Sequence, residues 1–205
     1  MKLLFASTNP HKVREVHAIL RTLRIEVIGL DAVEHAGREP VEDGDTFAAN
    51  ARIKAVHYAR ATGRWCLADD SGLAVDALGG APGVRSARYA GVGEDRLERD
   101  LANNARLLRE LEGTPPADRT ARFVCSMCLA DATGTVVAET SGSMQGVIAC
   151  EPRGHNGFGY DPLFVLPQFG CTSAELPPDK KNVLSHRGDA LRRIARLIRE
   201  LAPLF

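Results

Sequence analysis

The 205-residue sequence predicts a mixed α/β fold, with helices flanking an elongated mixed β-sheet. Three observations support this prediction. Amphipathic helical patterns dominate the first half of the chain, alternating strand-like segments dominate the middle, and another amphipathic helix closes the chain. We therefore expect a single domain, residues 1–205, made of two lobes with the active-site cleft between them.

The first part of the chain alternates strands and helices. A short apolar segment is followed by polar residues and then by a helix with apolar residues on one face. Asp45 or Thr46 is the expected N-cap of the next long helix, and Gly63 is its expected C-cap. The predicted elements are a strand at 2–6, a helix from about residue 11, a strand at 26–30, a loop at 31–45 and a helix ending near 63.

The rest of the chain is richer in strands. Leu97, Leu101 and Leu111 share one face of a predicted helix, and residues 131–134 form the turn of a predicted hairpin. The predicted elements are strands at 65–68 and 73–75, a loop at 79–93, a helix at 94–111, a hairpin of 121–130 with 135–141, a strand at 145–149, a loop at 151–162, a strand at 163–166 and a helix at 188–201.

Composition and charge narrow the possible functions. Basic and acidic residues balance at 26 each, so no global field draws the protein to nucleic acid or to a membrane surface. The sequence has no apolar run long enough to cross a bilayer and no signal-peptide pattern, which predicts a cytoplasmic protein. Cys125 and Cys128 form a CxxC, but they lie in an apolar segment and are interpreted as small buried residues rather than zinc ligands.

Two adjacent carboxylates, Asp69 and Asp70, follow the apolar segment 65–68 and precede Ser71 and Gly72. A strand that ends in acids and then turns would bring them to the mouth of a cleft. Neighbouring carboxylates raise each other's pKa, which favours a nearby cation. The alternative is a solvated turn, because Asp-Ser-Gly is typical of turns.

A second candidate segment, residues 7–12, lies between a strand and a helix. Backbone N–H groups at a helix N-terminus bind anions, and Lys12 adds a positive charge. The segment lacks the glycines of a Walker A motif, and an ordinary helix cap is the alternative. A third candidate is Glu42, which lies in an acidic segment before a helix where Asn50 and Lys54 share a face. These acids suit a hard cation or, alternatively, helix capping and surface charge.

Two further candidates lie in the last quarter of the chain. Phe158 stands between glycines, which suits stacking on a flat ring, although a turn anchored by one buried phenylalanine is equally consistent. Ser185 is an expected N-cap, so His186 and Arg187 fall in the first turn of the last helix. Basic residues there oppose the helix dipole, which suggests a ligand.

Together these segments resemble the inosine triphosphate pyrophosphatase family, whose members hydrolyse non-standard purine nucleoside triphosphates such as dITP and XTP. The matches appear in the family's order from residue 3 to about 195. The matching segments are STNPHK, EDGDTFAANARIKA, LADDSGLAVDALGGAPGVRSARYAG, GFGYDPLF, and AEL followed by KKNVLSHRGDAL.

The resemblance implies a homodimer that uses Mg²⁺ to hydrolyse ITP, dITP and XTP to the monophosphate and pyrophosphate, cleansing the nucleotide pool. It implies that Glu42 and Asp70 bind Mg²⁺, that Asp70 also accepts a proton, and that Asp69 and Lys54 support the triphosphate and the metal. The implied substrate contacts are Ser7, Thr8, Asn9, Pro10, His11, Lys12, Ser71, Phe158, Gly159, Tyr160, Asp161, Lys181, His186 and Arg187.

The sequence departs from the family pattern in two places. Cys171 stands where many bacterial members carry lysine, and Pro10-His11 replaces small residues of the first loop. Two alternative functions remain open at this point: a related pyrophosphatase that acts on modified pyrimidine nucleotides, and a nucleotide-binding sensor without turnover. Retention of both Asp69 and Asp70 argues against the sensor, because binding alone favours fewer negative charges near a triphosphate.

Overall fold

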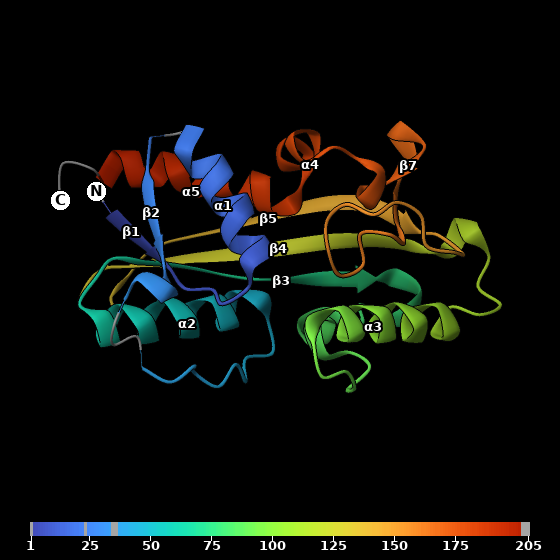
Figure 1. The fold of residues 1–205 in the computed structure, drawn as a ribbon, viewed down its shortest axis with the longest axis horizontal. Coiled ribbons are helices and arrows are strands. Elements are labelled where there is room, and N and C mark those ends of the chain that lie inside the picture. Colours follow the sequence, from blue (N-terminus) through green and yellow to red (C-terminus); the bar gives the residue numbers. More distant parts are fainter. Residues whose placement is uncertain (1, 23, 34–36, 202–205) are drawn as a thin grey trace. The chain divides into compact units, whose positions relative to one another are not determined.

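The structure is a computed structural model that describes residues 2–22, 24–33 and 37–201. Its helices and strands form a mixed α/β fold, which confirms the predicted class (Figure 1). The strands are β1 (Lys2–Phe5), β2 (Glu26–Gly29), β3 (Cys66–Val75), β4 (Thr120–Ala130), β5 (Val136–Ile148), β6 (Phe164–Leu166) and β7 (Cys171–Thr172). The α-helices are α1 (Pro10–Thr22), α2 (Phe47–Thr62), α3 (Arg96–Glu110), α4 (Pro178–Leu184) and α5 (His186–Leu201).

The sheet is mixed, with the strand order β2-β1-β3-β4-β5-β6-β7. β1 pairs parallel with β2 and with β3, whereas β6 pairs antiparallel with β5 and with β7. Among the helices in the described part of the chain, none has the length and apolar character needed to cross a membrane.

The chain divides into two compact units. The first unit comprises residues 1–70, 125–142 and 185–205, and the second comprises 71–124 and 143–184. The buried apolar residues follow the same division: two clusters belong entirely to the first unit and one belongs entirely to the second. The predicted position of the active-site cleft stays a prediction.

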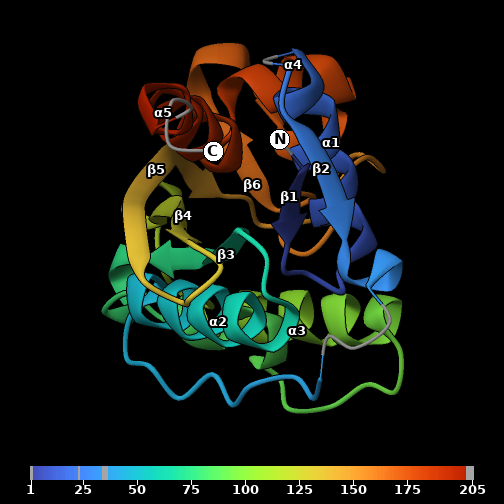
Figure 2. The ribbon, with the colours of Figure 1, turned by 90° about the vertical axis from the view of Figure 1, so that its left-hand side faces the viewer.

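In the first unit, α1 and α5 cover one face of the sheet and α2 covers the other (Figure 2). Leu67 of β3 packs into the cluster formed with α1 and α5, whereas its neighbours Cys66 and Ala68 pack into the cluster formed with α2. Successive side chains of a strand point to opposite faces, and this alternation continues along β3 to Asp69 and Asp70.

The predicted boundaries of α2 are confirmed, and their physical causes are visible. Thr46 is the N-cap, and its side chain accepts a hydrogen bond from the backbone N–H of Ala49. Gly63 is the C-cap and adopts the left-handed conformation at φ 62°, which glycine reaches without steric cost. Cys125 and Cys128 are free and buried, as their apolar surroundings predict.

In the second unit, α3 packs on a core that includes Leu107, Leu111, Phe123 and Phe164. The rings of Phe123 and Phe164 lie with their centroids 4.4 Å apart. Leu97 and Leu101, expected on the buried face of this helix, are 68% and 61% exposed. The face of α3 that turns inward carries polar residues near the start of the helix. The positions of the leucines therefore predicted the wrong buried face.

Two strands continue where the sequence predicts breaks. β3 runs through Asp69, Asp70 and Ser71 without the predicted turn, and β5 joins the two strands expected at 135–141 and 145–149. Gly72 serves close packing rather than a turn, because a Cβ atom there would lie 2.3 Å from Ser86 Oγ. The short helix α4 is also absent from the sequence prediction.

Candidate active site

The segment between β1 and α1 is organised by local hydrogen bonds. Asn9 Oδ1 accepts hydrogen bonds from the backbone N–H of His11 at 3.0 Å and of Lys12 at 3.5 Å, so Asn9 caps α1. The Ser7 hydroxyl accepts a hydrogen bond from the backbone N–H of Asn9 at 3.2 Å. Thr8 and Pro10 are exposed. The helix-cap interpretation therefore holds for Asn9, and anion binding by this segment stays a prediction.

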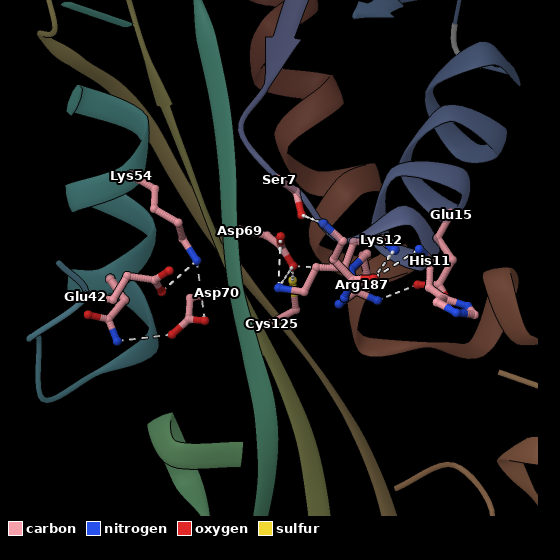
Figure 3. A network of polar contacts seen from close by, with 12 residues as sticks. Ser7, His11, Lys12, Glu15, Glu42, Lys54, Asp69, Asp70, Cys125 and Arg187 are labelled. Atoms are coloured by element: carbon pink, nitrogen blue, oxygen red, sulfur yellow. Dashed lines mark hydrogen bonds and ion pairs between the residues drawn. The ribbon is translucent and has the colours of Figure 1, made fainter. Parts of the chain in front are cut away.

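Asp69 lies at the centre of a buried charge network on the side of β3 that faces α1 and α5 (Figure 3). The Lys12 ammonium lies 3.2 Å from Asp69 Oδ1 and 3.1 Å from Oδ2, and the Arg187 Nε lies 3.3 Å from Oδ2. The Cys125 thiol donates a longer contact of 3.8 Å to the same oxygen. Each oxygen of Asp69 thus has a cationic donor.

These cations keep Asp69 ionised although it is completely buried. Burial by itself raises the pKa of a carboxyl group, but the positive charges of Lys12, Arg187 and Lys54 outweigh it and hold the pKa of Asp69 well below its usual range. A buried carboxylate in this state is a fixed anchor for the cations around it.

Arg187 is 1% exposed and stands in the first turn of α5. Its guanidinium donates to Asp69 through Nε and to Glu15 of α1 through another nitrogen. It therefore ties β3, α1 and α5 together within the first unit. His186, beside it, is also buried, and the Ser185 hydroxyl accepts a hydrogen bond from the backbone N–H of Gly188 at 3.0 Å, as expected of an N-cap. The predicted contacts of Arg187 and His186 with a base stay predictions.

Asp70 points to the opposite side of β3, toward α2, where it meets Lys54 and Asn50 (Figure 3). The Lys54 ammonium lies 2.8 Å from Glu42 Oε2 and 3.6 Å from Asp70 Oδ1. The Asn50 side chain donates to Asp70 Oδ2 at 3.2 Å and accepts from the backbone N–H of Gly44 at 2.8 Å. Asn50 and Lys54 share a face of α2 as their spacing predicts, and together they bring Glu42 and Asp70 to one place.

Burial and neighbouring charges both shift the pKa values of Asp70 and Lys54. Burial raises the pKa of Asp70, and the negative charges of Glu42 and Asp69 add to that increase, so that Lys54 and Lys12 offset only part of it. For Lys54 burial lowers the pKa, but the charges of Asp70, Asp69 and Glu42 outweigh it and the pKa is raised. Lys54 is therefore a firmly charged ammonium, held between two carboxylates.

The chemistry of these groups fits a magnesium ion. Glu42 and Asp70 direct carboxylate oxygens at one cationic group, and hard oxygen ligands are the ones that Mg²⁺ prefers. Within residues 2–22, 24–33 and 37–201, no group of three or more His, Cys, Asp or Glu side chains is placed to hold a metal by itself. Mg²⁺ commonly binds through one or two carboxylates together with substrate phosphates, so two carboxylates are enough.

A separate cluster in the second unit surrounds Phe158. Asp161 Oδ2 accepts hydrogen bonds from the Phe158 backbone N–H at 2.8 Å and from the Lys181 ammonium at 2.5 Å. The Lys181 ammonium lies 5.1 Å from the centroid of the Phe158 ring, and the guanidinium carbon of Arg96 lies 5.0 Å from it. Phe158 is half-buried, so its ring is not enclosed in the core. The buried Tyr160 donates to Ser86 O at 2.8 Å.

Some residues of these clusters were not predicted from the sequence. Glu15 stands three residues after Lys12, on the same face of α1, a spacing that places it near any partner of Lys12. Arg96, Asp100 and Asn104 lie at successive four-residue intervals on α3, a signal hidden by the leucines on that helix. Ser71 is partly exposed and belongs to the second unit.

Comparisons with known proteins add independent findings. Residues 3–197 match the model of the Ham1 family. A dITP/XTP pyrophosphatase of Anaeromyxobacter sp. (strain Fw109-5) is 46% identical, with 98% of each chain covered. A dITP/XTP pyrophosphatase of Desulforamulus reducens is 48% identical, covering 98% of this chain and 97% of the relative.

Solved structures agree with the sequence comparisons. A HAM1 protein from Coxiella burnetii superimposes with a TM-score of 0.85 at 41% identity, covering 98% of this chain and 99% of that one. A nucleoside-triphosphatase / dITP/XTP pyrophosphatase from Mycobacterium abscessus gives a TM-score of 0.74 at 44% identity, covering 95% and 97% of the two chains.

Proposed function

Because the chain belongs to the Ham1 family, we propose that it is a nucleoside triphosphate pyrophosphatase that removes non-standard purine nucleotides from the nucleotide pool. Its substrates are ITP, dITP and XTP, and its products are the nucleoside monophosphate and pyrophosphate. Relatives named dITP/XTP pyrophosphatase, about half identical over almost the whole chain, support this proposal, and the resemblance found in the sequence is confirmed.

The observation that carries the proposal is the convergence of Glu42 and Asp70 on the Lys54 ammonium. A site that hydrolyses a triphosphate needs both hard oxygen ligands for a metal and positive charge for the phosphates, and these three side chains supply both. When bound, Mg²⁺ would neutralise negative charge that develops on the phosphate oxygens. Glu42 and Asp70 are its proposed ligands.

The proposed reaction is attack of water on the α-phosphorus. The water oxygen forms a new bond to phosphorus, the bond to the bridging oxygen breaks, and pyrophosphate leaves. Asp70 takes the proton released by the water, as a general base. The ammonium groups of Lys12 and Lys54 stabilise the charge that develops on the leaving pyrophosphate. Asp69 holds Lys12 in place through its two short contacts.

Base recognition is proposed for the residues around Phe158. The Phe158 ring stacks on the base, with Gly159, Tyr160 and Asp161 around it. Inosine and xanthine carry an oxygen at position 6 that accepts a hydrogen bond from Lys181 or Arg187, and His186 lies beside Arg187 in sequence. Adenine carries an amino group at that position, and this donor cannot accept a hydrogen bond from either cation.

Two further parts of the proposal concern the oligomeric state, which follows from the resemblance, and the location of the protein. The protein acts as a homodimer, and it acts in the cytoplasm. Size-exclusion chromatography with light scattering measures the first directly, and a monomer at micromolar concentration would contradict it.

Pyrophosphate release tests the proposed activity. ITP, dITP, XTP, ATP and dTTP are each incubated with the full-length protein, with Mg²⁺ or with EDTA, and both pyrophosphate and orthophosphate are measured. The proposal predicts rapid pyrophosphate release from the first three substrates, only with Mg²⁺. Release of single phosphates would refute the proposal. Faster turnover of dTTP than of ITP would refute it in favour of a pyrimidine-specific enzyme, and tight ITP binding without turnover would refute it in favour of a sensor.

A further inference from the structure

The glycine that follows Phe158 is held at both of its backbone polar atoms by one helix. The backbone N–H of Gly159 donates to Asp100 Oδ2 at 2.8 Å, and the carbonyl oxygen of Gly159 accepts from the Asn104 side-chain amide at 3.0 Å. Asp100 and Asn104 are four residues apart on α3 and therefore lie on the same face of the helix.

Hydrogen bonds, rather than packing, hold Gly159 in place. Gly159 has a left-handed φ of 62°, and a Cβ atom built on it would meet nothing within 4 Å. Apart from its chain neighbours, no described atom therefore packs against the position that a side chain would occupy on Gly159. The two hydrogen bonds from α3 hold both polar atoms of its backbone, and Asp100 contributes a charged acceptor, which strengthens its bond.

The helix that carries these two side chains is itself firmly anchored in the second unit. Leu107 is fully buried in the core, and Asn103 donates to Ser86 O at 3.2 Å and accepts from the backbone N–H of Ala90 at 2.7 Å. Asp95 caps the start of α3 through the backbone N–H of Glu98. Groups that must orient a ligand contact are most effective when rigid elements carry them, and α3 is such an element.

Asp100 also links the loop to a cation beside the Phe158 ring. The Arg96 Nε lies 3.8 Å from Asp100 Oδ2, and the Arg96 guanidinium carbon lies 5.0 Å from the ring centroid of Phe158. A single carboxylate therefore contacts both the backbone that follows Phe158 and the guanidinium next to its ring.

We propose that Asp100 and Asn104 are positioning residues that hold the Gly159 backbone so that Phe158 and the neighbouring polar groups are presented to a purine base in one orientation. The inference rests on the proposed function, because it assigns these residues to base recognition. The inference goes beyond the proposed function because it assigns part of the purine selectivity to α3, through two side chains that do not themselves contact the base. Their loss weakens base binding and base discrimination and leaves phosphate chemistry largely unchanged.

The test compares four variants with the wild-type protein. Asp100→Ala removes the acceptor of the Gly159 N–H, and Asn104→Asp replaces the donor by an oxygen that repels the Gly159 carbonyl. Asp100→Asn keeps an acceptor oxygen and is the conservative rescue. Glu98→Gln is the matched control, because it removes one negative charge from the same helix without touching the loop.

Two readouts separate positioning from general support of the fold. Asp100→Ala and Asn104→Asp are expected to raise KM for ITP about tenfold with kcat within about twofold, and to lower the ratio of kcat/KM for ITP over ATP. Hydrogen exchange of the peptide that contains Gly159 is expected to become about tenfold faster in both variants. Asp100→Asn is expected to fall between Asp100→Ala and wild type, and Glu98→Gln to match wild type.

The measurements distinguish failure of the inference from failure of the proposed function. An unchanged KM and an unchanged substrate ratio in both variants, with active wild-type protein, would overturn the inference. An equal loss of kcat/KM for all substrates, with faster exchange throughout α3, would also overturn it, because it would show structural support alone. Wild-type protein that releases no pyrophosphate would instead refute the proposed function and with it the assignment to base recognition, while hydrogen exchange would still show whether α3 restrains Gly159.

Discussion

The two units hold their functional groups by different physical means. In the first unit, buried charges fix side chains: Asp69 contacts Lys12 and Arg187, and Lys54 lies between two carboxylates. In the second unit, hydrogen bonds fix the backbone of a glycine loop. Their acceptors are Asp100 and Asp161, and Asp161 also forms a buried ion pair with Lys181. The first arrangement sets the position of charge, and the second sets the orientation of a ring.

The difference has a consequence for mutation. Removing one member of a buried charge network leaves its partner desolvated and unpaired, which costs several kcal/mol and affects both stability and catalysis. Removing one hydrogen bond to a partly exposed loop costs much less and acts mainly on binding. We therefore expect large effects on turnover and stability in the first unit and, apart from the buried Lys181–Asp161 pair, smaller effects on KM in the second.

The largest expected effect is on turnover in Asp70→Asn. The amide keeps the size of the side chain but supplies neither a proton acceptor nor an anionic metal ligand, so kcat for ITP is expected to fall by about 10³-fold or more. Pyrophosphate release measures kcat, and calorimetric titration with ITP measures the binding that remains. Asp76→Asn is the matched control, because the Asp76 side chain contacts Thr120 and Arg122, is half exposed and lies outside the proposed site. Full activity of Asp70→Asn would contradict the mechanism.

The second prediction compares two ion pairs of α2. Lys54→Met leaves Glu42 and Asp70 facing each other without their shared ammonium, and is expected to lower the free energy of unfolding by about 3 kcal/mol in EDTA. Arg52 lies on the same helix and forms an exposed pair with Glu139 of β5, so Arg52→Met is expected to cost much less than Lys54→Met. Urea unfolding measures both.

Added Mg²⁺ provides a second comparison between Lys54→Met and Arg52→Met. If Glu42 and Asp70 are its ligands, added Mg²⁺ is expected to recover part of the stability lost in Lys54→Met and to leave Arg52→Met unchanged. Equal destabilisation by the two substitutions, or no response to Mg²⁺ in Lys54→Met, would remove the distinction on which the proposed metal site depends.

The third prediction concerns base binding in the second unit. Phe158→Leu keeps an apolar side chain but removes the aromatic face, and stacking on a base is worth about 1–3 kcal/mol, so KM for ITP is expected to rise about tenfold or more while kcat changes little. Phe169→Leu is the control, because Phe169 also has a lysine ammonium over its ring, 4.4 Å from the centroid, and lies outside the proposed site. Steady-state kinetics measures KM for both variants. Equal KM values for Phe158→Leu and Phe169→Leu would show that the assignment of Phe158 to base stacking is wrong.

Sequence reasoning located most of the charged residues but not how they are divided between faces. It predicted that a strand ends at residue 68, so Asp69 and Asp70 were expected together in a turn. The strand in fact continues, and its alternation sends Asp69 toward α1 and Asp70 toward α2. The spacing of Asn50 and Lys54 predicted a shared helix face, whereas the contact with Glu42 depends on how the preceding loop folds back.

The second unit was harder to predict because its inward helix face is partly polar. Leucines at 97 and 101 suggested the wrong face of α3, and that error hid Asp100 and Asn104, which turn toward the glycine loop. A hydrophobic pattern identifies a helix reliably, but it identifies the buried face only where burial is the dominant role of that face. Polar residues that support a loop do not appear in such a pattern.

The smallest expected effect is a pH dependence at the exposed edge of α3. Hydrogen bonds from Tyr89 and Arg106 hold the pKa of Glu110 below its usual value. A carboxyl group whose pKa is lower in the folded state contributes stability above its unfolded pKa and loses it as the pH falls through the folded value. Glu110→Gln is therefore expected to lose stability less steeply than wild type as the pH falls below about 4.5, with a difference under about 1 kcal/mol, because the group is partly solvated.

Urea unfolding at a series of pH values measures how steeply the stability of each protein falls with pH. The same Glu110→Gln substitution also tests the environment of Tyr89. Burial, followed by the hydrogen bond and charge of Glu110, raises the pKa of Tyr89 to about 12. In Glu110→Gln the charge is gone, so ultraviolet titration should find this phenol ionising at lower pH than in wild type. If Glu110→Gln instead matched Lys54→Met in its loss of stability, an exposed pair would be as important as a buried one, and the contrast between partly solvated hydrogen bonds and buried charges would fail.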